Sequence, residues 1–255
     1  MTIAYLTDNL DTLKVCSLIC RSWYIVVVPR IHHALILGDE RPDKRRDKLK
    51  PLSKLHGLGL TPLINEITVR QSLNSHWFVP QAFGRRDLRH FSAFTNVRTL
   101  KLEHLDIPRF MPGIERYFEQ FSSALRSITL WGPCCTPRQL SYFLSLFSNL
   151  EDIYIWRGST PNPNPTISDA ELVPPSAPEL RGELRLYGSH WAETWTHLIT
   201  SCGGPRFRYM NLRKAGDCAP ILFEACAETL ETLRIYPTDD AVGRSFNVVL
   251  SVDSD

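Results

Sequence analysis

A short pattern of apolar positions recurs along most of the chain. It consists of an apolar residue, two variable residues, an apolar residue, one variable residue and another apolar residue. The period-2 alternation at the end of each copy predicts a short β-strand. The middle apolar residues follow one another at steps of 23 to 33 residues, and one copy lacks its first apolar position. The seven copies span residues 64–69, 97–102, 125–130, 150–155, 182–186, 207–212 and 230–235.

The stretches between these copies are amphipathic. Their apolar residues are spaced three and four apart, which is typical of helices that bury one face. Four such helices are predicted, at residues 116–125, 137–147, 192–202 and 218–230. Regular alternation of strand and helix favours a parallel sheet with right-handed crossovers.

At this repeat length we expect an α/β protein that forms a curved, right-handed, leucine-rich-repeat-like solenoid, with parallel strands inside and helices outside. A doubly wound single sheet is the competing α/β fold. It is less favoured because its strands would not share one sequence pattern. We assign the repeat region to residues 61–255.

Two segments interrupt the repeats. Residues 41–50 (RPDKRRDKLK) are strongly basic and lie within a predicted linker at 38–60. A solvated linker is the favoured interpretation, and a nuclear-localisation or nucleic-acid role is the alternative. Residues 159–178 hold six prolines and predict an extended loop inserted into one repeat.

In such a solenoid, alternate strand residues point into the concave side. Two columns result, one between the last two apolar positions and one just after them. Tyr, Trp and Arg dominate binding hot spots, so these columns predict a protein partner or substrate at the concave face. The alternative is that Trp131 and Trp156 pack as core under the next loop. The expected partner-binding residues are Lys101, Trp131, Tyr154, Trp156, Arg185, Tyr187, Arg213, Arg234 and Tyr236.

The N-terminal residues follow a different pattern. Residues 11–23 have helical spacing, which places Leu13, Cys16, Cys20 and Trp23 on one face. Within this stretch, LKVCSLICRSW resembles the later helices of an F-box. With the repeats that follow, the chain resembles the F-box-like proteins that are numerous in mushroom-forming fungi.

This resemblance implies that residues 1–37 are a partial, helical F-box-like segment. An F-box docks on the Skp-type adaptor of a cullin-type ubiquitin ligase, and the repeats select the protein to be ubiquitinated. By resemblance, Leu13, Leu18 and Trp23 belong to the adaptor-binding segment. The usual opening, a Leu-Pro followed by an acidic residue, has no counterpart after Met1, so we expect an N-terminally truncated F-box. A stand-alone repeat-type binding protein with a degenerate F-box and no ligase role stays open as the alternative.

Composition narrows the classes of partner. The chain has 255 residues, 43% of them hydrophobic, which is enough for a continuous core. A net charge of +2, from 29 basic and 27 acidic residues, argues against a nucleic-acid partner. No apolar run is long enough to span a bilayer and the N-terminus does not resemble a signal peptide. We therefore expect no membrane partner and an intracellular location, in cytoplasm or nucleus.

The seven cysteines do not suggest a disulfide framework, because their number is odd and their spacing irregular. Most are expected to be small buried hydrophobic residues. The adjacent Cys134 and Cys135 lack a second pair at zinc-binding spacing. Cys16 and Cys20 lie upstream of two histidines, but a helix core explains both cysteines better than a metal does. We expect no metal and no cofactor.

An α/β enzyme is the third hypothesis. The chain has no Gly-rich phosphate loop and no G-x-S-x-G motif. His190 and Glu193 can be drawn as an acid–base pair, but such pairs arise by chance in a chain with eight histidines. We therefore expect that the protein is not an enzyme.

Overall fold

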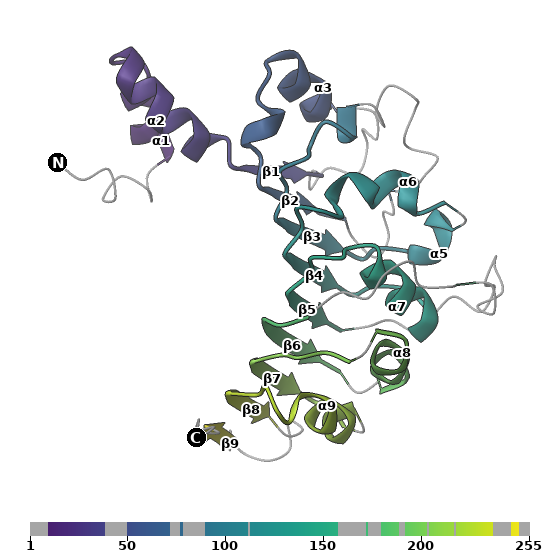
Figure 1. The fold of residues 1–255 in the computed structure, drawn as a ribbon. Coiled ribbons are helices and arrows are strands. Elements are labelled where there is room, and N and C mark those ends of the chain that lie inside the picture. The colour runs from purple at the N-terminus through teal and green to yellow at the C-terminus, as the bar shows by residue number, and fades with distance from the viewer. Residues whose placement is uncertain are drawn as a thin grey trace.

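The described part of the chain forms an α/β structure with one sheet and helices beside it (Figure 1). This confirms the predicted α/β class. The computed structural model describes residues 10–38, 50–71, 77–78, 90–111, 113–157, 172, 180–188, 192–202, 204–216, 218–236 and 246–249.

The strands lie in the sheet in the same order as in the chain. Strands β1 to β8 are parallel to their neighbours, and β9 pairs antiparallel with β8. The strands are β1 (Ala34–Leu37), β2 (Glu66–Val69), β3 (Thr99–Glu103), β4 (Ser127–Trp131), β5 (Asp152–Trp156), β6 (Glu183–Tyr187), β7 (Tyr209–Arg213), β8 (Thr232–Tyr236) and β9 (Phe246–Val249).

The register of the sheet matches the repeated sequence pattern. Each of the seven copies contributes one strand, and their middle apolar residues pair with one another from β2 to β8. Each of these residues is at most 7% exposed. A shift by one residue would turn this row to the other face, so burial holds the register. The row consists of Ile67, Leu100, Ile128, Ile153, Leu184, Met210 and Leu233.

Two strands were not predicted. Ala34–Leu37 was expected within the N-terminal helical segment, but these residues form β1 at the edge of the sheet, so their helical assignment was wrong. Leu35 and Leu37 are buried and pair with Ile67 and Val69 of β2. Strand β9 likewise has no counterpart among the predicted elements.

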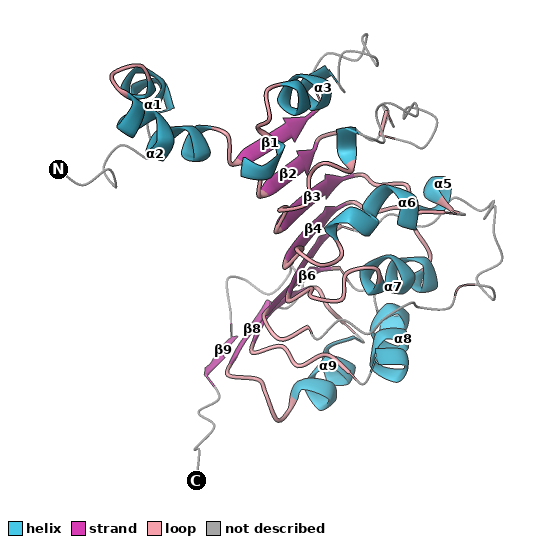
Figure 2. Cartoon of the chain, turned by 45° about the horizontal axis from the view of Figure 1, so that its top comes forward, coloured by secondary structure: helices cyan, strands magenta, loops and turns pink. Residues whose placement is uncertain are grey.

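Helices α3 and α5 to α9 lie along one face of the sheet (Figures 1 and 2). The opposite face, which no described helix covers, is called the open face below. The helices are α3 (Lys50–Gly57), α5 (Ile107–Phe110), α6 (Glu115–Phe118), α7 (Pro137–Ser145), α8 (Ala192–Cys202) and α9 (Cys218–Cys226), with 3-10 turns at Thr61–Leu63 and Glu119–Phe121.

All four predicted helices start within one residue of their expected positions, and three of them end earlier than expected. The structure confirms α8 over residues 192–202, whereas the stretch 116–125 is divided into α6 and a 3-10 turn. Helix α7 starts where its sequence dictates. Thr136 caps it by accepting a hydrogen bond from the Gln139 amide, the Gln139 side chain accepts one from the Thr136 amide, and Pro137 occupies the first turn.

The space between sheet and helices is filled with aromatic rings. Phe118 is completely buried and packs edge-on against Phe143 and Phe147, and it also contacts Phe110 and Phe121. Each of these rings buries a large apolar area between the helices and the sheet. The core is therefore continuous along the sheet.

The N-terminal helical segment is two helices and not one. Helix α1 (Leu10–Ser17) and helix α2 (Arg21–Ile31) pack against each other beyond the β1 end of the sheet (Figure 1). A turn at 18–20 separates them, with Cys20 in extended conformation. The predicted single face of residues 11–23 was therefore wrong: Leu13 is buried, Cys16 is partly buried and Cys20 is exposed. The turn allows the chain to fold back, which a continuous helix could not do.

The predicted interruptions lie largely outside the described residues. This applies to residues 39–49 of the basic linker and to all of the proline-rich insertion except Leu172. The last part of the predicted linker, in contrast, is helix α3.

Candidate partner-binding surface

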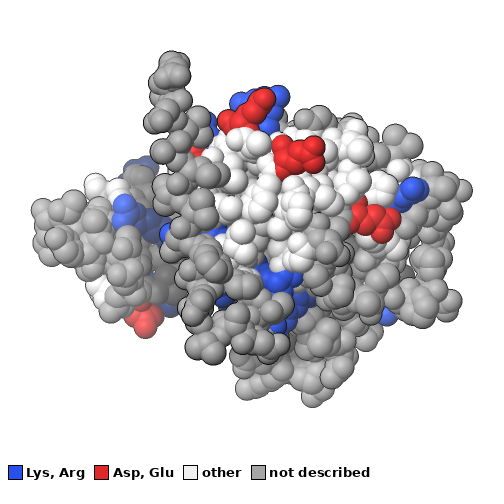
Figure 3. All heavy atoms as spheres, turned by 90° about the horizontal axis from the view of Figure 1, so that it is seen from below, with Lys and Arg blue, Asp and Glu red and all other residues white. Residues whose placement is uncertain are grey.

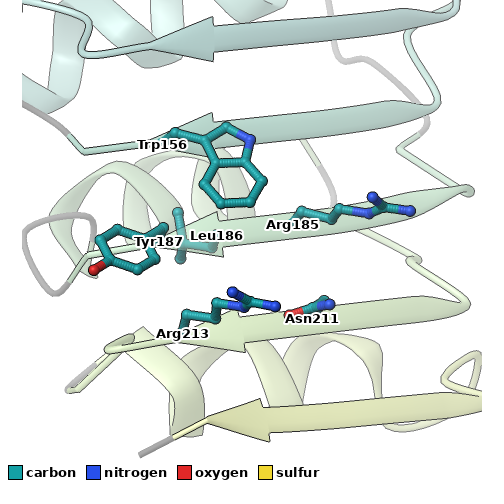
Figure 4. A pocket seen from close by; sticks show the side chains of 6 residues that line it. All are labelled: Trp156, Arg185, Leu186, Tyr187, Asn211 and Arg213. Carbon is teal, nitrogen blue, oxygen red and sulfur yellow. The ribbon is translucent and has the colours of Figure 1, made fainter. Parts of the chain in front are cut away.

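The strands alternate between two environments. Their apolar residues face the helices and are buried, whereas the residues between them face the open face (Figure 4). Period-2 alternation along each strand produces this division. Because neighbouring strands are in parallel register, open-face residues of equal position form columns that run across the sheet.

One column lies at the ends of the strands and is here called the aromatic column. The sheet register pairs each member with the next. It contains five of the predicted partner-binding residues and begins with one acidic residue: Glu103, Trp131, Trp156, Tyr187, Arg213 and Tyr236. Trp131 is 45% exposed and Trp156 is half-buried, so neither packs in the core. The alternative interpretation, in which both pack as core under the next loop, is therefore wrong.

The rings of this column stack on one another. The Trp131 and Trp156 ring centroids are 5.6 Å apart with planes 16° from parallel, and those of Trp156 and Tyr187 are 6.1 Å apart at 21°. Strands about 4.8 Å apart bring such rings within stacking distance. The result is a continuous aromatic strip across β4, β5 and β6.

Cationic side chains lie against the end of the strip. The guanidinium carbon of Arg213 is 4.4 Å from the Tyr236 ring centroid. The charged groups of Arg157 and Lys214 lie 5.9 Å and 5.6 Å from the Tyr187 ring centroid. Cation–π attraction of this kind holds a charge beside an aromatic face without neutralising it.

A small open pocket of about 60 Å³ lies between the two open-face columns (Figure 4). Side chains from β5, β6 and β7 line it: Trp156, Arg185, Leu186, Tyr187, Asn211 and Arg213.

The second column of predicted residues lies two residues before the aromatic column on each strand. Lys101 forms an ion pair with Glu66 at 2.7 Å. Arg185 donates two hydrogen bonds to Glu183, at 2.8 and 2.9 Å, and lies 5.0 Å from the ring centroid of Tyr154. Two predicted cations of this column are therefore neutralised by acidic residues of the same face. Arg234 is exposed on β8.

The pKa values of Tyr154 and Arg185 are both raised, and Glu183 contributes to both shifts. Burial is the main cause that raises the pKa of Tyr154 to about 12, followed by the charges of Asp152 and Glu183. The hydrogen bonds to Glu183 raise the pKa of Arg185 above its ordinary value. Both effects keep Tyr154 neutral and Arg185 charged at physiological pH.

The aromatic column differs in this respect. Among the described residues, no carboxylate forms an ion pair with Arg157 or Arg213. Glu103, the acidic member of the column, lies 4.0 Å from Arg70. Within the described part of the chain, the charges of Arg157 and Arg213 are thus not balanced by a carboxylate in an ion pair.

Sequence reasoning missed Arg157 and Lys214, since only the strand positions themselves were assigned to columns. Each follows the last residue of its strand in left-handed conformation, with φ of 49° and 53°. The sequence did offer one sign of this position, because glycine occupies it after β4 and β6. Gly132 and Gly188 both have positive φ there, as Arg157 and Lys214 do after their strands.

A second surface lies on the N-terminal helical pair. Of the residues assigned to adaptor binding by resemblance, Leu13 is buried, Trp23 is half-buried and Leu18 is 85% exposed. Leu18 therefore faces outward, whereas Leu13 belongs to the interior. Further apolar side chains are exposed on the pair or in the turn between its helices: Val15, Ile19, Tyr24, Ile25 and Val26.

An open groove of about 990 Å³ adjoins this pair. Tyr24 of α2, Leu35 of β1 and Leu55 of α3 line it together with Leu58 and Leu60. Six of the large apolar side chains that are exposed among the described residues lie on the helical pair or in its turn, and a gathering of exposed apolar side chains is typical of an interaction site.

The described residues contain no cluster of three or more His, Cys, Asp or Glu that could hold a metal ion. Of the proposed acid–base pair, His190 lies outside the described residues, and Glu193 approaches His197 on the exposed side of α8. In the part of the chain that is described, no helix has the length and apolar character needed to cross a membrane.

Charge on the end of the molecule that holds β8 and α9 is mixed. Figure 3 shows basic and acidic side chains dispersed there among uncharged ones. The described residues visible at this end form no large area of one sign, unlike the basic stripe typical of nucleic-acid binding.

Comparisons of the chain with models of protein families, with curated proteins and with solved structures found no match.

Proposed function

We propose that this protein is a leucine-rich-repeat-like solenoid that binds a protein partner on the open face of its sheet. In this proposal the N-terminal helical pair is a partial F-box that docks a Skp-type adaptor. The chain is then the substrate-recognition subunit of an F-box-type ubiquitin ligase.

The observation that carries the proposal is the aromatic column. Stacked Trp and Tyr rings with Arg at their end have the composition of binding hot spots and lie on an exposed sheet face. Nothing in the fold requires them there, because the strands already bury their apolar residues on the other face. Repeat proteins that stack strands and helices use such a face for recognition.

The adaptor part of the proposal is supported by exposed apolar side chains on the helical pair. Leu18, Ile19 and Ile25 are each more than half exposed. Leaving them in water costs free energy that docking against a partner would recover. The resemblance of LKVCSLICRSW to F-box helices is the reason for proposing a Skp-type adaptor as this partner.

The test is a pull-down of the chain by a purified Skp-type adaptor. Wild-type protein is expected to bind, and Leu18→Asp is expected to abolish binding without affecting the fold, since Leu18 is exposed. Ile36→Asp is the matched control, because Ile36 is also exposed but lies on β1. It should bind as wild type does.

Failure of the wild-type chain to bind the adaptor would overturn the ligase role. The stand-alone binding module would then replace it, and the open face would keep its proposed function. Equal loss of binding in both variants would contradict the assignment of the adaptor site to the helical pair.

A further inference from the structure

We propose that the small pocket on the open face holds the carboxylate of one Asp or Glu side chain of the partner protein. This inference rests on the proposed partner-binding function of the open face. It adds the chemistry of one contact, which the aromatic column alone does not define.

The first argument is the size of the pocket. Its volume is about 60 Å³. Sites that enclose a small-molecule ligand commonly measure about 300–1,000 Å³, whereas a few water molecules or one polar group fill a space of this size. The pocket therefore suits a single side chain of a bound protein better than a free ligand.

The second argument is that hydrogen-bond donors line the pocket, whereas none of the described residues that line it is acidic. Asn211 and Arg213 lie on β7, and the Arg213 side chain points along its strand toward Asn211 (Figure 4). Arg185 approaches from β6. The remaining walls are aromatic or apolar: Trp156, Leu186 and Tyr187. A group bound in this pocket therefore has to accept hydrogen bonds.

The two arginines of the pocket differ in what balances their charge. The Nε and Nη2 atoms of Arg185 donate to the carboxylate of Glu183. Arg213 has no ion pair with a carboxylate in the described part of the chain, and Arg157, which follows β5, has none either. A partner that complements this site therefore carries a negative charge there.

The ring of Tyr236 restrains Arg213 for this contact. The guanidinium carbon of Arg213 lies 4.4 Å from the ring centroid. This contact limits the motion of the guanidinium, while its N–H donors keep their capacity to bind oxygen. Two of these donors form a planar fork that matches the two oxygens of a carboxylate, and the Asn211 amide can donate a further hydrogen bond.

A side-chain carboxylate fits this site better than other anions do. Backbone amides capture the terminal carboxylates of peptides, but the strands around the pocket are paired with their neighbours in the sheet. Phosphate groups are commonly bound by clusters of arginines. Arg213 is the one pocket arginine whose charge Glu183 does not balance, and a single guanidinium suits the single charge of a carboxylate.

The test follows the side-chain NMR signals of Arg213 and Asn211 while capped amino acids are added to the full chain. N-acetylglutamate methylamide is expected to shift both signals with saturation, and to bind more weakly as salt is raised. N-acetylglutamine methylamide should bind at least about tenfold more weakly, because it lacks the charge. Equal binding of the two overturns the proposal.

Two further probes separate the sources of the anion. N-acetylphosphoserine methylamide carries a phosphate, and N-acetylglycine carries a free terminal carboxylate. Both are expected to bind more weakly than N-acetylglutamate methylamide. Tighter binding of either one overturns the assignment to an Asp or Glu side chain.

Variants separate binding from folding. Arg213→Gln should weaken the binding of N-acetylglutamate methylamide at least about tenfold. Its melting temperature should stay within about 4 °C of wild type, because only the contact with Tyr236 is lost. Arg208→Gln is the matched control: Arg208 is exposed just before β7, pairs with Glu231 and lies outside the pocket, so this variant should bind as wild type. Unchanged binding in Arg213→Gln overturns the inference.

Trp131, which lies outside the pocket, distinguishes this inference from the proposed function. A protein partner that is lost in Trp131→Ala but retained in Arg213→Gln would overturn only the carboxylate site. A partner whose binding neither variant changes would overturn the proposed function of the open face as well.

Discussion

The two faces of the sheet are built from the same strands but follow different rules. On the helix-covered face, Ile, Leu and Met replace one another along a row and are all buried. On the open face, individual residues have individual partners, as Glu66 has Lys101 and Glu183 has Arg185. Burial is non-directional and tolerates exchange, whereas ion pairs and stacked rings depend on their neighbours. We therefore expect stability to depend mainly on the covered face, and the proposed recognition to depend on the open face.

Magnitudes support this division. Burying a Leu, Ile or Phe side chain contributes about 1.5–3 kcal/mol. A stacked aromatic pair adds about 0.5–1.5 kcal/mol, and an exposed ion pair adds about 0–1 kcal/mol. Substitutions on the covered face should mainly change the free energy of unfolding, and those on the open face should mainly change binding.

The largest expected effect is on the covered face. Phe118→Ala should lower the free energy of unfolding by about 3–5 kcal/mol, because it leaves a cavity among five or more rings. Denaturant unfolding followed by circular dichroism measures this. Trp131→Ala on the open face is the control and should cost less than about 1.5 kcal/mol. Similar losses in the two variants would contradict the expectation that the covered face contributes more to stability than the open face.

A smaller loss of stability is expected at Gly132, the residue that directly follows strand β4. Gly132→Ala should lower the free energy of unfolding by about 1–3 kcal/mol. Its φ is 60°, and an added Cβ would lie 2.6 Å from Nδ1 of His104. Gly59→Ala is the matched control, since its φ of 66° imposes the same backbone cost but nothing lies within 4 Å.

Thermal and denaturant unfolding of the two glycine variants separate backbone strain from steric conflict. Gly132→Ala should be the less stable of the two, and His104→Ala should partly restore it. Equal stability of the two variants would show that His104 moves aside without cost.

The smallest effect is a titration on the open face. The pKa of Tyr154 is expected near 12, because burial and the charges of Asp152 and Glu183 disfavour the phenolate. This pKa is raised in the folded state, so the contribution of Tyr154 to stability is present below pH 10 and is lost as the pH rises through about 12.

Ultraviolet absorbance titration, compared with Tyr154→Phe, isolates this group. Glu183→Gln should lower the pKa of Tyr154, since it removes a nearby negative charge and weakens the 3.3 Å hydrogen bond. An unchanged pKa in Glu183→Gln would mean that burial and the charge of Asp152 raise the pKa without a contribution from Glu183.

The amino-acid sequence by itself determined the repeated strands, their register and the columns of the open face. These follow from local periodicity: alternate residues of a strand face opposite sides, and the apolar set has to be buried. The pattern of apolar positions therefore predicted both the buried row from Ile67 to Leu233 and the open-face column from Glu103 to Tyr236.

Other features were decided only by the tertiary structure. The turn at 18–20, the membership of Ala34–Leu37 in the sheet and the stacking of Trp131 on Trp156 depend on what each segment packs against. The placement of Arg157 and Lys214 over Tyr187 depends on a left-handed backbone that neither residue favours. Local preference does not predict such features, because hydrogen bonds and burial between segments far apart in the chain outweigh it.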